Sequence, residues 1–511
     1  MPTVEIDGAS LTLDRVIDVA RGGASVAIAD HAVERVKQAR RLVDDIVDTG
    51  RTVYGVTTGF GKLSEIVIDR ENVEALQRNL ILSHSAGVGD PLGEETVRAI
   101  LVLRINALSK GHSGIRLTTL KTLVEMLNRG VCPVVPEKGS LGASGDLAPL
   151  SHLCSVLIGK GEAWYEGRRL PGRQAMEAAG LEPVVLGAKE GLALINGTQV
   201  MTAIGCLAVH DAEILAATAD ICGAMTMEAL RGIPAAYSER IMNVRPHQGA
   251  AKVAANLRRL VQGSRLTTGQ GEIRVQDAYT LRCIPQVHGA SRDAISHIRS
   301  VLETEINSAT DNPLVFPGAP QEEEVLSGGN FHGQPVALAM DYLGIAAAEL
   351  ADISERRIER LVNPALSGLP AFLTRFGGIN SGFMLVQYSA AALVSENKVL
   401  AHPASVDSIP SSANQEDHVS MGTIGARKAG EIISNVSNVL AMELLTAAQA
   451  VEFQGPEKMG RGSRAAYDLI RRHVSPLEDD RPMSGDISVV EGLVRSGRIL
   501  AAVESAVGRL E

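Results

Sequence analysis

Apolar residues recur at helical spacing along much of the chain. From Val33 to Val47, and again from Glu94 to Lys110, they return every three or four positions, and Gly111 follows the second run. This spacing places them on one face of a helix, and glycine is a frequent helix end. The pattern predicts a helix over each run and another over Leu147 to Ile158.

The longest helical patterns lie in the second half of the chain. One apolar stripe runs from Pro335 to Leu361, with Pro364 just beyond it, and another runs from Ala426 to Phe453, where Gly455 and Pro456 follow. Helices of about 25 residues span roughly 37 Å at about 1.5 Å per residue. We therefore expect a bundle of long helices.

Strand signals are confined to the first part of the chain. Residues Val4 to Thr12 alternate and turn at Asp7-Gly8, which predicts a small hairpin, and Ala163 to Leu170 predict a second strand pair that turns near Glu166-Gly167. The sequence thus predicts two domains, a mixed one over residues 1–192 and a helical one over residues 193–511.

Composition narrows the function classes. Of the 511 residues, 45% are hydrophobic but only 3% are aromatic, so the core must consist of aliphatic side chains packed between helices. The formal net charge of −10 argues against nucleic acid or an anionic membrane as the main partner. We expect neither.

A stretch of twenty residues, 191–210, contains no charged side chain. Asn196, Thr198, Gln199 and Thr202 interrupt it, which favours a helix buried on all sides over a lipid-facing span. Such a helix needs neighbours on every face, and subunit association is the economical way to provide them.

The cysteines and the N-terminus indicate a reducing compartment. The five cysteines are odd in number and scattered, with no Cys-x-x-Cys or metal-ligand spacing. They are Cys132, Cys154, Cys206, Cys222 and Cys283. No basic region followed by an apolar run opens the chain, so we expect a cytoplasmic protein.

The run of residues 139–150, Gly-Ser-Leu-Gly-Ala-Ser-Gly-Asp-Leu-Ala-Pro-Leu, could do chemistry with its own backbone. If the nitrogen of Gly145 closes on the carbonyl carbon of Ala143, a five-membered ring forms. Loss of two waters, one of them from Ser144, then leaves an exocyclic methylene, an electrophile that no ordinary side chain supplies. The alternative is an ordinary turn in which Ser144 or Asp146 caps the following helix.

This run, extended to His152, resembles the cofactor loop of the aromatic amino acid ammonia-lyases, and the resemblance covers nearly the whole chain. It implies a methylidene-imidazolone (MIO) made from Ala143, Ser144 and Gly145, with no metal and no nucleotide. It also implies a mainly α, aspartase/fumarase-like fold, in which a long helical bundle joins a smaller mixed N-terminal domain carrying the MIO loop. The resemblance further implies a homotetramer whose active sites are shared between subunits.

The glycine-rich run of residues 54–61, Tyr-Gly-Val-Thr-Thr-Gly-Phe-Gly, separates two helical patterns. By itself Tyr54 could be a core residue with a satisfied hydroxyl. The resemblance instead places Tyr54 on a mobile lid as a catalytic acid or base. A phenol can act as a base only if its pKa is lowered, for example by a helix N-terminus or a nearby arginine.

Two positions select the substrate in the family. By resemblance, Ser83 and His84 line the pocket for the substrate side chain, and Glu416 stands where phenylalanine- and tyrosine-acting relatives usually carry Gln. An imidazole and an acid can both hydrogen-bond an imidazole ring. Taken alone, His84 reads as a structural histidine and the acids around Glu416 as a helix start.

The remaining candidate residues bind the amino acid or flank the ring. An amide in an apolar stretch needs a partner, and the resemblance places Asn196 near the substrate carboxylate and the MIO carbonyl. Arg282 offers a fork for a carboxylate, although it could equally pair with a core aspartate. Gln276 and Tyr279 share its motif, with Tyr279 as a further catalytic candidate, and the family places Phe331 beside the MIO.

The resemblance therefore implies that L-histidine is converted to trans-urocanate and ammonia. It leaves open whether Tyr54 or Glu416 takes the β-proton, and whether the amine or the imidazole of the substrate meets the electrophile. A tyrosine or phenylalanine lyase, or an aminomutase, is the first alternative, because the motif at Phe331 is also compatible with aminomutases. A non-catalytic helical scaffold is the second. Pairs such as His402-Pro403 and Asp417-His418 lack chelating spacing and predict no metal site.

Overall fold

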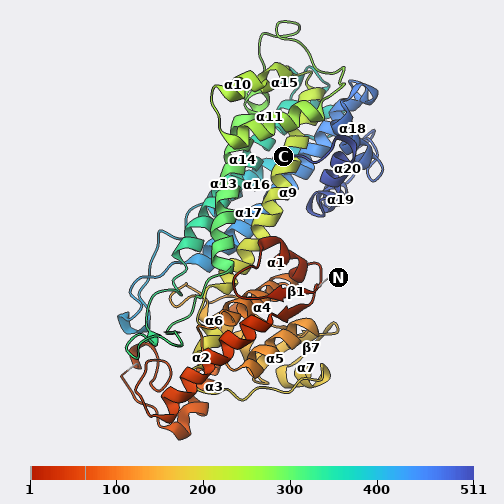
Figure 1. The fold of residues 1–511 in the computed structure, drawn as a ribbon. Coiled ribbons are helices and arrows are strands. Elements are labelled where there is room, and N and C mark those ends of the chain that lie inside the picture. The colour runs from red at the N-terminus through yellow and green to blue at the C-terminus, as the bar shows by residue number, and fades with distance from the viewer. Residues whose placement is uncertain (1–2, 64) are drawn as a thin grey trace. The chain divides into compact units, whose positions relative to one another are not determined.

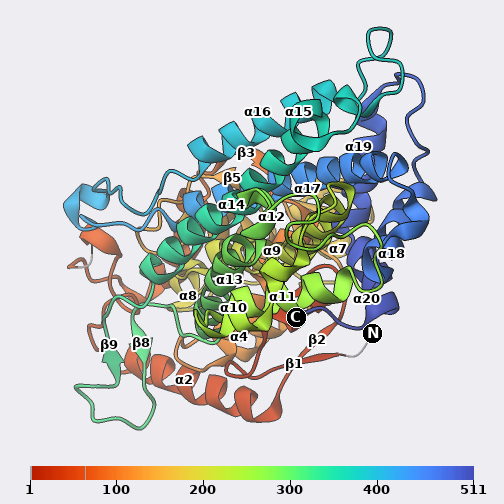
Figure 2. The same ribbon diagram turned by 90° about the horizontal axis from the view of Figure 1, so that it is seen from above.

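The computed structural model describes residues 3–63 and 65–511, and most of them lie in helices (Figures 1 and 2). The α-helices are α1 (Leu13–Ala20), α2 (Asp30–Asp48), α3 (Val73–His84), α4 (Glu94–Ser109), α5 (Leu117–Asn128), α6 (Leu147–Leu157), α7 (Gly172–Ala178), α8 (Glu190–Ile195), α9 (Gln199–Ala229), α10 (Glu239–Asn243), α11 (Gln248–Leu260), α12 (Tyr279–Arg282), α13 (Ile284–Ile306), α14 (Gln334–Val362), α15 (Pro364–Ser367), α16 (Met384–Leu400), α17 (Gly422–Glu452), α18 (Arg461–Arg471), α19 (Met483–Arg495) and α20 (Arg498–Val507). The strands are β1 (Val4–Ile6), β2 (Val26–Ile28), β3 (Val88–Pro91), β4 (Cys132–Pro133), β5 (Pro136–Lys138), β6 (Glu162–Tyr165), β7 (Arg168–Pro171), β8 (Leu314–Val315) and β9 (Val325–Leu326).

The chain forms two compact units, each assembled from three separate segments. The first unit comprises Met1–Leu207, Arg299–Asp341 and Pro403–Arg427, and the second comprises Ala208–Ile298, Tyr342–His402 and Lys428–Glu511. The helices α9, α13, α14 and α17 each continue from one unit into the other. The division of the sequence into domains at residue 193 stays a prediction.

Most of the predicted elements are confirmed. Helices α2, α4, α6, α14 and α17 cover the five helical patterns, and β6 pairs with β7 in antiparallel register, with Tyr165 opposite Arg168. The mainly α fold is likewise confirmed. In these helices the apolar period was strong enough to fix both the type of element and the buried face.

The hairpin predicted over Val4 to Thr12 is wrong. Strand β1 instead pairs in parallel with β2, with Val4 opposite Val26. The turn signal at Asp7-Gly8 serves another purpose, because the Asp7 carboxylate accepts hydrogen bonds from the amides of Ala9 and Ser10 and leads the chain into α1. A parallel partner that lies twenty residues downstream leaves no local signal in the sequence.

The uncharged stretch of residues 191–210 is not one helix, as its pattern predicted, but parts of two. Helix α8 ends at Ile195, Asn196 has an extended backbone (φ −89°, ψ 112°), and α9 begins at Gln199. Among the described residues, α9 is the one helix long and apolar enough to cross a membrane, and 72% of its most apolar window is buried. The core helix of a globular protein has the same character.

Buried charges join the long helices of the second unit. On α14, Arg357 donates to both carboxylate oxygens of Glu443 on α17, at 2.5 and 2.8 Å, and both side chains are fully buried. On α13, His288 contacts Asp220 on α9 at 2.8 Å, and its other ring nitrogen lies 3.3 Å from Arg357. A buried charge without its partner is costly, so this network favours one alignment of the four helices.

Candidate active site

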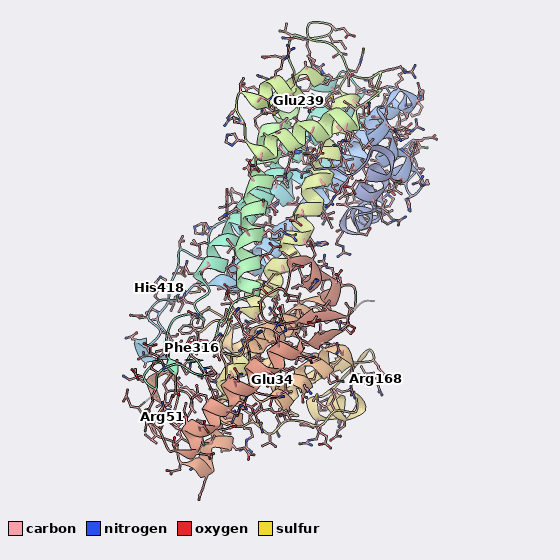
Figure 3. All side chains as sticks on the ribbon, viewed as in Figure 1. Glu34, Arg51, Arg168, Glu239, Phe316 and His418 are labelled. Carbon is pink, nitrogen blue, oxygen red and sulfur yellow. The ribbon has the colours of Figure 1, made fainter. Side chains whose placement is uncertain are left out.

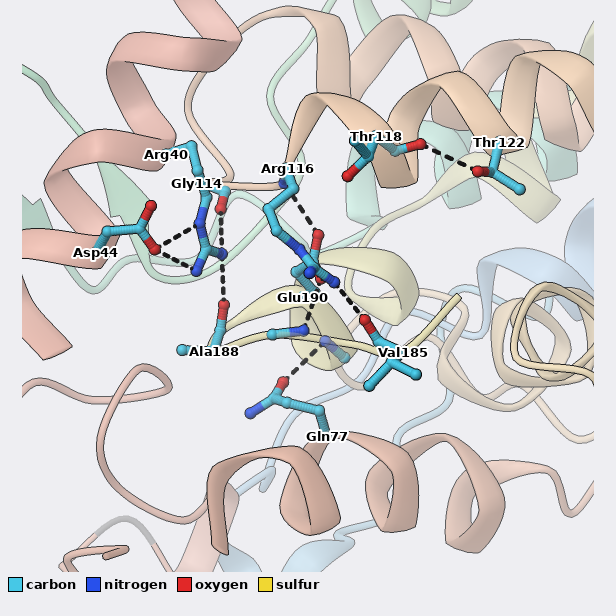
Figure 4. Close-up of polar contacts among 12 residues, drawn as sticks. Arg40, Asp44, Gln77, Gly114, Arg116, Thr118, Thr122, Val185, Ala188 and Glu190 are labelled. Carbon is cyan, nitrogen blue, oxygen red and sulfur yellow. Dashed lines mark hydrogen bonds and ion pairs between the residues drawn. The ribbon is translucent and has the colours of Figure 1, made fainter. Parts of the chain in front are cut away.

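The residues around α8 are held by a polar network of the first unit (Figure 4). The Glu190 carboxylate accepts from the backbone and guanidinium of Arg116 and from the amide of Gly187. Gln77 accepts from Gly191 at 2.8 Å, and Arg40 donates to the Ala188 carbonyl at 2.9 Å. Helix α8, and with it Asn196 at its end, is therefore fixed from several sides.

A fully buried arginine holds the break between α8 and α9. Arg104 donates to the carbonyl of Asn196 at 2.9 Å and to Oε1 of Gln199 at 2.6 Å, and also to the carbonyl of Ala193. The two backbone carbonyls are free to accept because the last carbonyls of a helix have no partner within the helix. At Gly197 (φ 152°), a Cβ atom would lie 2.5 Å from the Arg104 guanidinium, so only glycine fits there.

The predicted ring-forming loop makes a tight turn against this break. Gly142 and Gly145 face each other as an isolated bridge, which leaves Ala143 and Ser144 at the tip. Both glycines have positive φ, and a Cβ atom at Gly145 would lie 2.2 Å from the carbonyl oxygen of Gly197. Glycine is therefore required at 145, where the amide nitrogen must reach the Ala143 carbonyl for a ring to close.

Asp146 anchors the loop but does not cap its own helix. Its buried carboxylate accepts from the amides of Val200 and Met201 at 2.9 Å, which lie at the start of α9, and from the hydroxyl of Ser140 at 2.9 Å. Thr423 donates to it as well. Burial raises the pKa of Asp146, although these hydrogen bonds act in the opposite direction. The loop is thus more than an ordinary capping turn.

The residues present fit an MIO group. The turn at Ala143 and Ser144 has the small residues and the sharp geometry that cyclisation needs, and Asn196 Nδ2 donates to the Ser144 carbonyl at 3.4 Å. Asn196 Oδ1 is buried and has no hydrogen-bond partner among the described residues. Unsatisfied buried polar atoms are rare in folded proteins, so this oxygen suits a ligand or a chemically altered loop.

Glu416 faces the loop. The hydroxyl of Ser144 donates to Glu416 Oε1 at 3.1 Å, and Ser411 donates to Oε2 at 2.8 Å. The stretch around Glu416 is not the helix start that its acids could have indicated, because Ser411 and Glu416 pair across a short turn. In that turn Ser412, Ala413 and Asn414 all have left-handed backbones (φ 50–65°), at a cost of about 1 to 2 kcal/mol for each of Ser412 and Ala413.

His84 ends α3, and its Nδ1 lies 3.0 Å from Oγ of Ser83, which leaves Nε2 for a ligand. Burial lowers the pKa of His84 below its ordinary value of 6.5, and the smaller effects of the Leu80 carbonyl and of Glu416 act against it. The ring is therefore mostly neutral at pH 7, so it can donate and accept hydrogen bonds.

Tyr54 lies in a loop, as the glycine-rich run predicted. Its hydroxyl oxygen accepts from the amide of Gly61 at 3.4 Å. Before it, Arg51, which is labelled in Figure 3, binds Glu324 at 2.8 Å in the segment that joins β8 to β9. After it, Thr58 and Val67 form an isolated bridge. The loop is tied at its ends, and Tyr54 is half-buried.

Phe331 is half-buried at the turn before α14. Next to it, the ring of His332 stacks on His418, with centroids 5.4 Å apart. Within the described residues, no three His, Cys, Asp or Glu side chains gather in a way that could hold a metal ion.

The other three predicted residues lie in the second unit. Gln276 precedes α12, whereas Tyr279 and Arg282 are the first and last residues of this four-residue helix. Tyr279 is 69% exposed, and the Arg282 guanidinium stacks over its ring at 4.5 Å. Arg282 donates to the backbone carbonyl of Asp277 at 3.0 Å, whereas the aspartate side chain pairs with Arg274.

The sequence has many relatives of known name. Residues 11–472 match the model of the aromatic amino acid lyases. The chain belongs to this family. It is 62% identical to a histidine ammonia-lyase of Alkaliphilus oremlandii, and the alignment covers 99% of each chain. It is thus a carbon–nitrogen lyase that acts on a small molecule.

Solved structures of the family share the fold. Histidine ammonia-lyase from Trypanosoma cruzi is 46% identical, with a TM-score of 0.92 over 99% of this chain and 96% of the other. Tyrosine aminomutase from Streptomyces globisporus is 41% identical, with a TM-score of 0.96 over all of both chains. The fold is therefore common to members with different reactions, and the side chains must decide the substrate.

Sequence reasoning missed several residues that hold the site. Arg104 is the only charged residue between Ala99 and Ser109, and a charge inside an otherwise apolar helix could have drawn attention to it. Asp146 was considered only as a helix cap. Ser411 has no signal in the sequence, because its pairing with Glu416 depends on the turn between the two residues.

Proposed function

We propose that this protein is a histidine ammonia-lyase, which converts L-histidine to trans-urocanate and ammonia. The observation that carries the proposal is the placement of an acid at the ring-forming loop, where Ser144 binds Glu416 at 3.1 Å. A carboxylate beside an electrophile suits a substrate whose ring carries N–H groups, and it suits a phenyl or phenol side chain less.

His84 supports the same substrate. Its pKa is lowered by burial, and Glu416 is close enough to act on its charge. A neutral imidazole and a carboxylate together offer one acceptor, one donor and one negative charge to an imidazole ring. This pair would bind histidine in preference to phenylalanine, which has nothing to satisfy those polar groups.

We propose that Ala143, Ser144 and Gly145 form the MIO group. When formed, the group supplies an electrophile that makes ammonia a better leaving group and the β-proton more acidic. Asn196 would hold its position, because the Asn196 amide already donates to the Ser144 carbonyl and its own Oδ1 is unsatisfied. No metal or nucleotide has a part in the proposal.

Proton transfer falls to this chain's own residues. Tyr54 and Glu416 are the two candidates for the base that takes the β-proton, since phenol and carboxyl groups both serve as general acids and bases in enzymes. Tyr54 lies on a loop and can approach a bound substrate, whereas Glu416 is held in place by Ser411. Phe331 and Ser83 would line the pocket around the ring.

We further propose a homotetramer whose active sites are shared between subunits. Tyr279, beside Gln276 and Arg282, is 69% exposed in the single chain and is therefore available for contact with another copy. Arg282 would bind the substrate carboxylate in a site of another subunit. The protein would act in the cytoplasm.

The test is a side-by-side assay of purified protein with histidine, tyrosine and phenylalanine. Rising urocanate absorbance from histidine, with little product from the other two, is the expected result. Since tyrosine aminomutase shares 41% identity over the whole chain, β-amino acids should also be sought among the products. No urocanate from histidine, with cinnamate, coumarate or a β-amino acid in its place, would refute the proposal.

A further inference from the structure

The turn before Glu416 is built to hold one carboxylate oxygen. The amide of Ser411 donates to the carbonyl of Glu416 at 2.9 Å, and the amide of Glu416 donates to the carbonyl of Ser411 at 3.3 Å. The two residues therefore face each other across the turn. The Ser411 hydroxyl adds a third contact, to Oε2, at 2.8 Å. Backbone and side chain thus fix the carboxylate together.

The backbone of this turn is strained. Ser412, Ala413 and Asn414 all have positive φ, although none of them is glycine. Consecutive left-handed residues of this kind persist only where surrounding contacts hold them, and they are concentrated at functional sites. Here they reverse the chain so that Ser411 lies beside Glu416. The strained turn therefore places the Ser411 hydroxyl next to the Glu416 carboxylate.

Ring formation in the loop affects the hydrogen bonds of the two Glu416 carboxylate oxygens differently. Oε1 has its donor in the hydroxyl of Ser144, whereas Oε2 has its donor in Ser411. If the proposed function holds, Ser144 loses its oxygen as water during ring formation. Oε1 then loses this donor, while Oε2 keeps the one from Ser411.

We propose that Ser411 is a positioning residue for the substrate's imidazole: it holds Oε2 of Glu416, so that Oε1 stays directed at position 144 and accepts an N–H group of the substrate ring. Ser411 acts through Glu416 and does not touch the substrate itself. Without its hydroxyl the carboxylate can rotate, and the binding energy for the ring in the transition state falls.

The key variant is Ser411→Ala, assayed for urocanate formation. We expect kcat/KM for histidine to fall about tenfold, as for loss of one hydrogen bond to a charged group. Ser411→Thr keeps the hydroxyl, and the extended backbone at this position (φ −134°, ψ −179°) accepts a β-branched residue, so it should restore the wild-type value to within about threefold. Ser408→Ala is the matched control, because the Ser408 hydroxyl lies in the same segment but accepts its hydrogen bond from the amide of Val419.

A double-variant cycle separates this role from a merely structural one. In a Glu416→Ala background, Ser411→Ala should change the residual kcat/KM by less than about twofold, since position 416 then holds no acceptor for the Ser411 hydroxyl. The intact mass of Ser411→Ala should remain two waters below that of the uncyclised chain. Should this variant fold poorly, Ser411→Cys, a weak donor of similar size, is expected to lower kcat/KM in the same way.

Wild-type kinetics in Ser411→Ala or Ser411→Cys would overturn the proposal, and so would a kcat/KM in Ser411→Thr as low as in Ser411→Ala. It would also be overturned if Ser411→Ala lowered kcat/KM equally in the wild-type and Glu416-variant backgrounds, or if the Ser411→Ala protein had the uncyclised mass. Each of these leaves the lyase assignment untouched. A wild-type protein that makes no urocanate would instead remove the proposed function, before any variant is compared.

Discussion

The hydroxyl of Ser144 donates to Oε1 of Glu416 across 3.1 Å, although 272 positions separate the two residues. The first belongs to the loop proposed to form the electrophile, and the second is the residue proposed to select the substrate. On that proposal, their contact places the chemistry and the specificity of the reaction at one point of the first unit.

Ser144→Ala should abolish nearly all turnover of histidine, because the variant has no hydroxyl to lose and cannot form the exocyclic methylene. The fold should remain, since Ala143 and Gly145 keep the turn and Asp146 keeps its four hydrogen bonds. Urocanate absorbance and circular dichroism measure the two effects. Turnover above about one hundredth of the wild-type rate would speak strongly against the cofactor.

The double variant His84→Leu, Glu416→Gln should use histidine poorly and accept phenylalanine better. Removing an imidazole and a charge leaves the substrate ring without its partners, at about 1 to 3 kcal/mol for each lost polar contact. We expect kcat/KM for histidine to fall at least about a hundredfold. Unchanged histidine kinetics would show that neither residue selects the substrate.

Tyr54→Phe tests the proton-transfer role. Loss of a positioned acid or base lowers kcat by about 10² to 10⁴. The intact mass should equal that of the wild type, adjusted for the substitution, because Tyr54 has no part in ring formation here. A kcat within about tenfold of the wild-type value would assign the proton transfer to Glu416 instead.

The buried charges of the second unit should control stability. Replacing Arg357 with Met leaves Glu443 buried without its cation, and we expect a loss of about 3 to 5 kcal/mol in the free energy of unfolding, measured in urea. The control is Arg173→Met, which removes a more exposed and looser pair, 3.7 Å from Glu177. Its urea midpoint should not change. Equal effects of the two variants would contradict the network's role.

His84 should make the stability of the folded protein decrease as the pH falls. Its folded pKa lies below the unfolded value of about 6.5, so the unfolded chain binds the proton first on acidification. The resulting contribution to stability is full above pH 6.5 and is lost as pH falls toward the folded pKa. The urea midpoint of the wild type, relative to His84→Gln, should therefore drop between pH 8 and pH 5.5, and a relative rise would contradict the buried neutral histidine.

Long-period patterns predicted the helices well, because an apolar stripe directly reports a buried face. Helices α14 and α17 begin and end within a few residues of their predicted bounds. The parallel pairing of β1 with β2 could not be predicted, and neither could the break at Asn196, since both depend on partners far along the chain. Local sequence patterns predict individual helices and strands, whereas the contacts between distant segments are known only from the folded chain.

The candidate site shows the same limit. Residues 143–145, Tyr54 and Glu416 could be named because their motifs are distinctive. The residues that support them could not be named, because Arg104 and Ser411 act through hydrogen bonds that only the folded chain creates. The left-handed turn at residues 412–414 violates local preference, and sequence reasoning could not anticipate it.

The most direct test of the central claim is the intact mass of the freshly purified protein, measured together with its activity on histidine. We expect a protein that is two waters lighter than its sequence requires and that produces urocanate, and a Ser144→Ala variant with the full unmodified mass. A fully active wild-type protein of unmodified mass would contradict it.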